Sequence, residues 1–191
     1  MNDDEQTPDD ELLLRYVRGE TRAFDDLVER YHRRVYAVAL RMTGNPEDAR
    51  DVCQDVFISA MRALRRFRGD AKLSTWFHRV AINASTDHLR KQRRHIGPGL
   101  DDVPERADDE PGPPERAEDA SRAVAVHEAL GDISDEHRAV LVLHDLQGLD
   151  YGEVADVLGV PVGTVKSRIH RARSELARRL GHLRETEPQG G

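Results

Sequence analysis

The sequence predicts an all-α fold of two small helical domains joined by a flexible acidic linker. Apolar residues recur with the helical period, and no stretch of strand length alternates with period two. Charged residues make up 34% of the chain and aromatic residues 5%, which suits surface-rich helical domains better than one large enzyme core. We therefore divide the 191 residues into domains 1–96 and 121–184, a linker 97–120 and a disordered tail 185–191.

The linker is recognised by its charge. Residues 101–119 hold nine acidic residues against Arg106 and Arg116, which gives a net charge of −7. The run Pro111-Gly112-Pro113-Pro114 lies within this segment and disfavours regular structure. Such a segment cannot bury enough apolar surface to offset the conformational entropy that it would lose on folding.

The N-terminal domain begins with a short predicted helix, Asp10–Arg18, which ends before a glycine. Two longer helices follow, with apolar stripes from Phe24 to Met42 and from Ala49 to Leu64. The run Thr43-Gly44-Asn45-Pro46 predicts the turn between them. Ser74 is the expected N-cap of a further helix.

The C-terminal domain is predicted to contain two short capped helices before its last helix. Ser134 can cap the first, which has apolar residues from Val140 to Leu146 and ends at Gly148. Asp150 can cap the second, and Glu153 three residues later completes the pattern of a capping box.

Residues 150–180 predict a helix-turn-helix, in which Gly159 supplies the positive φ of the tight turn. Apolar residues on its second helix form one buried stripe: Val165, Ile169, Ala172 and Leu176. The opposite face carries polar and cationic residues: Lys166, Ser167, Arg168, His170, Arg171 and Arg173. A basic face on a terminal helix can be merely solvated. Combined with the turn and the stripe, however, it favours contacts with phosphates and guanine edges in a major groove of DNA.

A second cationic region spans residues 62–94, with a net charge of +8. Cations beside exposed rings suit single-stranded nucleic acid, whose bases stack on aromatic side chains. Of the neighbours Trp76 and Phe77, at least one belongs to the core, and we expect Phe77 inside and Trp76 partly exposed. Asn83 and Asp87, one helical turn apart, either read base edges or belong to an ordinary exposed surface.

The helix before this region carries an acidic stripe of Asp48, Asp51 and Asp55 beside Gln54, opposite its apolar residues. Acidic stripes are usually solvated. In a protein with two cationic surfaces for nucleic acid, the stripe is also a suitable docking surface for a protein partner.

Enzyme activity is not expected, because the sequence has no nucleotide-binding, zinc-protease or paired-cysteine motif. We also expect no metal and no cofactor. The single cysteine, Cys53, lies on an apolar stripe, where a buried and inert thiol is predicted. The longest apolar runs are too short to span a bilayer, and the N-terminus is acidic rather than that of a signal peptide. These features predict a cytoplasmic protein without membrane insertion.

Three runs in this order, DVCQDVF, STWFHRVAIN and PVGTVKSRIHRAR, resemble the extracytoplasmic-function sigma factors of bacterial RNA polymerase. The N-terminal domain is similar to sigma region two, and the C-terminal domain is similar to the helix-turn-helix of region four. The resemblance implies a subunit that directs core polymerase to promoters and promotes strand opening, often in a stress response. The implied partners are the β′ and β subunits of the polymerase core, duplex and non-template promoter DNA, and an anti-sigma factor. We expect the free chain to be a monomer.

The resemblance also implies the roles of particular residues. The set that docks on core polymerase is Asp48, Asp51, Gln54, Asp55 and Phe57. The set that melts and binds the minus-ten element is Phe67, Arg68, Lys72, Trp76, Arg79, Asn83 and Asp87. The set that reads the minus-thirty-five element is Thr164, Lys166, Ser167, Arg168, His170 and Arg171. The alternative function is a stand-alone helix-turn-helix transcriptional regulator, which would need an effector pocket or a dimer face in residues 1–95.

Overall fold

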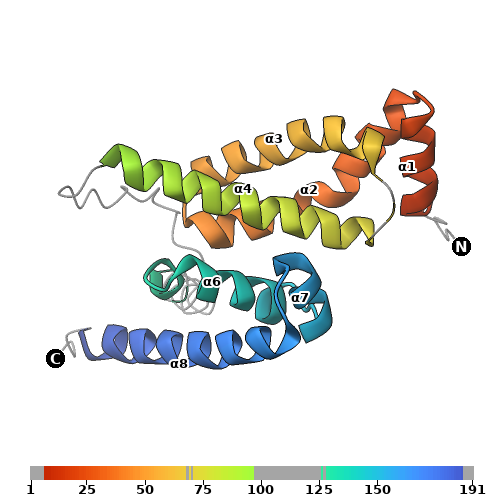
Figure 1. Ribbon diagram of the computed structural model, residues 1–191. Helices are drawn as coiled ribbons and strands as arrows, with labels where there is room; N and C mark the ends of the chain where they lie inside the picture. The colour runs from red at the N-terminus through yellow and green to blue at the C-terminus, as the bar shows by residue number, and fades with distance from the viewer. Residues whose placement is uncertain (1–6, 68, 70, 97–125, 127, 187–191) are drawn as a thin grey trace, which may run out of the picture.

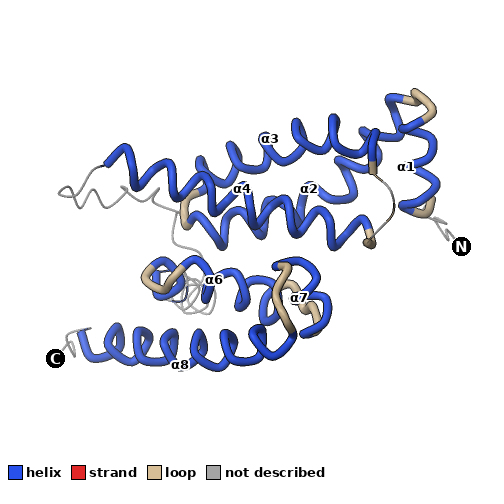
Figure 2. Tube along the Cα trace, in the orientation of Figure 1, coloured by secondary structure: helices blue, strands red, loops and turns tan. Residues whose placement is uncertain are grey.

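The computed structural model of the protein describes residues 7–67, 69, 71–96, 126 and 128–186, and within these ranges every regular element is a helix (Figures 1 and 2). The predicted all-α fold is thereby confirmed. The predicted linker and the last five residues of the predicted tail, 187–191, lie outside the described residues.

The N-terminal domain is a helical bundle. It contains α1 (Asp9–Val17), α2 (Thr21–Thr43), α3 (Pro46–Ala63), a 3₁₀ turn η1 (Leu64–Arg66) and α4 (Leu73–Ile96). Helices α2, α3 and α4 pack side by side, and α1 packs against α2 at one end of the bundle (Figure 1).

The predicted turn between α2 and α3 is confirmed, and it is capped from both sides. Gly44 has a φ of 79° and closes α2, and its N–H donates to the carbonyl of Leu40 at 2.9 Å. The side-chain oxygen of Asn45 accepts from the N–H groups of Glu47 at 2.7 Å and Asp48 at 3.3 Å. Because these bonds satisfy free backbone donors of α3, the chain reverses within three residues and α3 packs against α2.

The apolar stripes of the three long helices meet in one core. Tyr31 of α2 stacks on Phe77 of α4 with ring centroids 4.3 Å apart, and both rings are buried. The Tyr31 hydroxyl donates to the carboxylate of Asp9 at the start of α1. Burial, reinforced by the Asp9 carboxylate, raises the pKa of Tyr31. This tyrosine therefore joins three helices through one side chain.

The start of α4 differs from the prediction. The helix begins at Leu73, and the N–H of Trp76 already donates to the carbonyl of Lys72 at 3.1 Å. Ser74 therefore lies inside the first turn and is not the N-cap. The reason is the burial of Leu73, which is 4% exposed and draws the first turn into the core.

The C-terminal domain has a helical turn at residues 128–131, then α6 (Asp135–Leu141), a π-helical segment η2 (Val142–Leu146), α7 (Tyr151–Leu158) and α8 (Val162–Thr186). The predicted caps are confirmed. The Ser134 hydroxyl accepts from the N–H of His137 at 3.3 Å. Asp150 and Glu153 exchange both bonds of a capping box, at 2.8 and 3.1 Å.

Two details of the C-terminal domain correct the sequence-based picture, and the exposure of Leu146 adds a feature that the sequence did not predict. Leu146 is 44% exposed. The π-helical bond from the Gln147 N–H to the Val142 carbonyl widens this turn and rotates its end away from the core. Leu176, predicted to belong to the buried stripe, is only partly buried, and it packs against the core. Helix α8 continues to Thr186, so the first two residues of the predicted tail are helical.

The two domains pack against each other (Figure 1). Helix α7 lies against α4, and α6 and η2 lie against α2. Helix α7 of the predicted helix-turn-helix therefore contacts α4 of the second cationic region, whereas α8 packs on α6 and α7.

Candidate nucleic-acid and polymerase interfaces

Helices α7 and α8 form the predicted helix-turn-helix. Gly159 has a φ of 65°, and the N–H groups of Gly159 and Val160 both donate to the carbonyl of Ala155, at 2.8 and 3.2 Å. The small Ala155 side chain is 8% exposed where the two helices approach. This turn fixes which face of α8 is turned to the core and which is exposed.

The buried face of α8 holds Val165, Ile169 and Ala172, all at most 3% exposed. The opposite face presents the exposed residues Lys166, Ser167, His170 and Arg171. Thr164 is partly buried, and its carbonyl accepts from the hydroxyl of Ser167 at 2.9 Å. The predicted division of α8 into a buried and a polar face is confirmed.

The arginines of α8 have different environments. Arg168 is 2.6 Å from Glu136 of α6, and Arg173 makes two bonds to Asp145, at 2.5 and 3.1 Å. Arg171 is exposed and forms no ion pair with any residue that the structure describes. Of these side chains, Arg171 is therefore the one whose donors are available to an external acceptor.

An aromatic group at the start of α7 was missed by the sequence-based reasoning. Tyr151 is 37% exposed and lies beside the ring of His144, with centroids 4.7 Å apart. The Lys166 ammonium is 5.7 Å from the centre of the Tyr151 ring. A cation over an aromatic face is attracted by it, so Tyr151 positions Lys166 on the polar face of α8. In the sequence, the position of this aromatic residue directly after the Asp150 cap could have indicated its role.

The second cationic region centres on aromatic side chains. Phe77 is 1% exposed and Trp76 is partly exposed, as expected. Trp76 makes edge contacts with Phe77 at 5.2 Å and with Phe67 at 6.1 Å. The ring of Trp76 is thus supported from two sides and still reaches the surface.

The polar residues of this region are distributed along α4 and the loop before it. Asn83 and Asp87 are exposed on α4, and Asp87 pairs with Arg90 at 3.3 Å. Lys72 and Arg79 point toward α7: the Lys72 ammonium is 3.8 Å from Glu153, and Arg79 donates to the carbonyl of Asp156 at 2.5 Å. Arg68 lies outside the described residues.

Helix α3 carries the predicted docking set. Asp51, Gln54 and Asp55 are exposed, and Phe57 is partly buried. Asp48 differs from them, because its two carboxylate oxygens face α4 and contact His88 Nε2 at 2.8 Å and Gln92 Nε2 at 3.3 Å. Asp48 therefore ties α3 to α4.

Beside this set is a cavity of about 400 Å³ that is open to the surface. Its lining comes from α2 and α3: His32, Tyr36, Arg50, Cys53, Gln54 and Phe57. His32 stacks between Tyr36 at 6.3 Å and Phe57 at 6.2 Å. The histidine and tyrosine were missed because they lie on the helix before the acidic stripe. Cys53 is buried as predicted, and burial raises the pKa of its thiol.

The described residues were also searched for metal sites and for membrane-spanning helices. Among the residues described, no three His, Cys, Asp or Glu side chains are gathered where they could hold a metal ion. No described helix combines the length and the apolar character that crossing a membrane requires.

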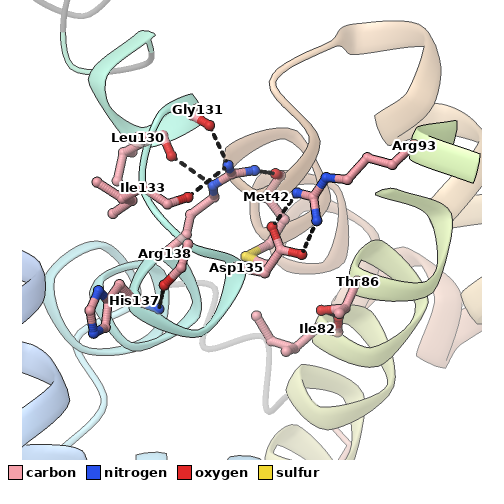
Figure 3. Close-up of polar contacts among 11 residues, drawn as sticks. Met42, Ile82, Thr86, Arg93, Leu130, Gly131, Ile133, Asp135, His137 and Arg138 are labelled. Atoms are coloured by element: carbon pink, nitrogen blue, oxygen red, sulfur yellow. Dashed lines mark hydrogen bonds and ion pairs between the residues drawn. The ribbon is translucent and has the colours of Figure 1, made fainter. Parts of the chain in front are cut away.

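The contact between the domains includes a buried cation (Figure 3). Arg138 of α6 is 3% exposed and donates to the carbonyls of Leu130 at 2.7 Å, Gly131 at 2.7 Å and Ile133 at 3.3 Å. It also donates to the carbonyl of Met42 in the last turn of α2. Burial lowers the pKa of Arg138. Nearby, Arg93 of α4 makes two bonds to Asp135, at 2.9 and 2.7 Å.

Both domains of the chain are similar to known proteins of one family. Residues 27–95 match the family model of sigma-70 region 2, and residues 123–176 match that of sigma-70 region 4. The chain is 42% identical to the ECF RNA polymerase sigma factor SigM of Mycobacterium tuberculosis, over 92% of this chain and 86% of that protein. It is 38% identical to the RNA polymerase sigma-H factor of Pseudomonas aeruginosa, over 93% and 96%.

A solved structure, CnrH in complex with the cytosolic domain of CnrY, matches with a TM-score of 0.66 and 30% identity, covering 91% of this chain and 97% of that one. The similarity to SigM covers both domains of this chain and most of the length of SigM. The chain therefore belongs to the extracytoplasmic-function family of RNA polymerase sigma factors.

Proposed function

We propose that this sigma factor directs core RNA polymerase to its promoters with three separate surfaces. The exposed face of α8 reads duplex DNA at the minus-thirty-five element. The Phe67–Trp76 cluster and α4 capture the melted strand at the minus-ten element. The acidic face of α3 docks on the polymerase. The observation that supports this proposal is that one chain presents an exposed polar and cationic helix face in a helix-turn-helix and a cluster of aromatic rings near cations.

At the minus-thirty-five element, we assign base contacts to Lys166, His170 and Arg171. All are exposed on the face of α8 that points away from its buried stripe. Arg171 has the geometry for two bonds to a guanine edge, and Ser167 suits a phosphate contact. Arg168 holds α8 to α6 in this scheme, because Glu136 already occupies its guanidinium.

At the minus-ten element, we assign base stacking to Trp76. Its ring is braced by edge contacts with Phe67 and Phe77, so little further ordering is needed when an unpaired base stacks on it. Asn83 and Asp87 are exposed on the same helix and are within the reach of a strand held there. The cations Lys72 and Arg79 would contact the phosphates.

The docking surface on α3 comprises Asp51, Gln54 and Asp55, with Phe57 at the rim of the neighbouring cavity. Phe57 and the stacked His32 and Tyr36 supply an apolar centre, and the carboxylates supply a charged rim. That composition is typical of protein–protein interfaces. Asp48 supports this surface from behind through its contact with His88.

The chain itself would carry out no catalysis, since phosphodiester formation belongs to the polymerase, and it would act in the cytoplasm as a monomer until it binds core. CnrH was solved in complex with the cytosolic domain of CnrY. By analogy, we propose that an anti-sigma factor holds this chain inactive. Residues 1–96 would form the polymerase and minus-ten domain, and residues 121–184 the minus-thirty-five domain.

In vitro transcription tests this function. Core polymerase freed of other sigma factors is mixed with the chain and with fragments of the bacterium's genomic DNA, and the 5′ ends of the transcripts are mapped. The proposal expects start sites that need the chain and share two sequence elements. A stand-alone regulator, the alternative function, would produce no start sites beyond those of core polymerase alone.

A further inference from the structure

Lys166 is the only lysine of the C-terminal domain, and its side chain lies against an aromatic ring. The ammonium is 5.7 Å from the centre of the Tyr151 ring, within the range of a cation–π contact. No acid of the described ranges pairs with this lysine. Because a lysine carries a point charge on a long flexible stem, the contact with the ring decides where this charge is held.

The Tyr151 ring is itself held by a second ring. Tyr151 is the first residue of α7 and is 37% exposed, so it reaches the surface. The His144 ring lies beside it, with centroids 4.7 Å apart and planes inclined by 31°. The Nδ1 of His144 is 2.7 Å from the carbonyl oxygen of Leu149 and donates to it, because a carbonyl oxygen only accepts. This bond fixes the orientation of the imidazole that supports the tyrosine.

Two neighbouring residues of the π-helical segment η2 act on α8. His144 supports the ring that contacts Lys166, and Asp145 makes two bonds to Arg173, at 2.5 and 3.1 Å. Lys166 and Arg173 are seven residues apart, so they lie on the same side of α8 about two helical turns apart. The ring under Lys166 is therefore tied to a segment that also holds the helix.

We propose that Tyr151, supported by His144, is a specificity-determining positioning residue for the minus-thirty-five element. It holds the Lys166 ammonium at one place on the polar face of α8, where the ammonium reads the edge of one base pair. This inference rests on the proposed function, which assigns base contacts to Lys166 and gives no role to either ring. The chemistry that suits a fixed ammonium is a pair of adjacent acceptors in the major groove, which the N7 and O6 atoms of guanine provide.

The physical gain is in discrimination. A side chain that is already ordered loses less conformational freedom when it binds. An ammonium released from the ring would reach acceptors on neighbouring base pairs and phosphates as well, so it would still attract DNA but would no longer favour one base. Loss of the ring is therefore expected to relax the sequence preference at one position and to leave the preferences at the other positions unchanged.

The contact between ring and lysine can be measured in the free full-length chain. The sequence contains three lysines, so labelling with ¹³C-lysine gives three ε-carbon signals, and K166R identifies the one from Lys166. Protons over the face of an aromatic ring are shielded, so the ε-protons of Lys166 should lie upfield of the other two. Y151L should return them to the ordinary position, and Y151F, which keeps the ring, should not. Equal positions in wild type and Y151L would overturn the platform.

Promoter choice gives the second readout. Core polymerase with the chain transcribes a library of promoters whose minus-thirty-five element is randomised, and the transcripts are sequenced. Y151L should lower the preference at one base pair by about two- to tenfold, the range expected for losing the order of one flexible side chain, and Y151F should retain it. In the K166A background Y151L should have no further effect, whereas in the R171A background its effect should be undiminished.

The remaining outcomes separate this inference from other roles of the ring. A defect in Y151F as large as that in Y151L would overturn it, because the hydroxyl would then contact DNA directly. So would a uniform loss over all promoters in Y151L with every base preference retained, which is the result expected of a packing residue. A wild-type chain that starts no transcription contradicts the proposed function, while the Lys166 signal still decides whether the ring holds the lysine.

Discussion

The Arg168 guanidinium lies 2.6 Å from the Glu136 carboxylate, so one of the cations predicted to read DNA also connects α8 to α6. Arg171, one turn along the same helix, is exposed and has no such acid within the described part of the chain. Two arginines on one helix thus have different environments, one paired with an acid of α6 and one exposed. The pair provides a matched comparison.

Replacing Arg171 with alanine should weaken the use of cognate promoters by about 1–3 kcal/mol, if its guanidinium contacts a base edge. Thermal stability should be unchanged, because no described side chain pairs with it. Competitive transcription from a set of promoters measures the effect. An unchanged ranking of promoters would remove Arg171 from the residues that read sequence.

Replacing Arg168 with alanine should lower the free energy of unfolding by about 0.2–1 kcal/mol, the range expected for a pair whose acid is largely exposed. Glu136 is 68% exposed, so water screens the pair and keeps the effect small. Urea unfolding of R168A beside R171A gives the comparison. Equal stability of the two variants would mean that the Glu136 contact contributes nothing measurable.

Replacing Trp76 with alanine should impair open-complex formation more than binding to core polymerase. The ring lies on α4 rather than on α3, and it is only partly buried, so part of its surface is accessible to a base. Permanganate reactivity of unpaired thymines reports opening, and co-purification reports binding to core. If both decline together, Trp76 is a packing residue.

Replacing Asp150 with alanine removes the side-chain acceptor of the Glu153 N–H and should cost about 0.5–2 kcal/mol, although the backbone N–H of residue 150 can still donate to the Glu153 carboxylate. Because α7 positions α8, binding to duplex DNA should decline with the stability of the domain. Urea unfolding and gel shift measure the two effects. Asp150→Asn keeps an acceptor for the Glu153 N–H and is expected to retain most of the stability.

His78 predicts a pH dependence. Burial, with a further contribution from Arg34, lowers the pKa of His78 from its ordinary value of 6.5. The unfolded chain therefore takes up its proton first, and the stability contributed by neutral His78 is complete above pH 6.5 and is lost as the pH falls below it. His78→Gln should flatten this part of the curve of unfolding free energy against pH. A variant whose curve parallels the wild type between pH 7 and about 5 would contradict the assignment.

Local signals in the sequence predicted much of the fold. Asn45, Ser134 and Asp150 are caps that act within three residues of their own positions, and Gly159 is set by its own turn. The burial of Phe77 beside a partly exposed Trp76 also followed from helical periodicity. Such features depend on neighbours along the chain, which the sequence displays directly.

The remaining features depend on contacts between residues distant in the sequence. Arg138 reaches the carbonyl of Met42, and Arg93 reaches Asp135, through a domain arrangement that no periodicity encodes. Asp48 was predicted to lie on an exposed acidic stripe, but its carboxylate contacts His88 of α4. A polar side chain can pair with many different groups. Its actual partner is therefore decided by how the helices pack, which the sequence does not show directly.

The central claim is that one chain brings core polymerase to a duplex and then separates its strands. Permanganate footprinting at a start site found with the chain measures this most directly, with core polymerase alone and with the chain alone as controls. The account predicts reactive thymines in the minus-ten segment only when chain and core are both present. Binding of the joint complex with no reactive thymine at any start site would contradict it.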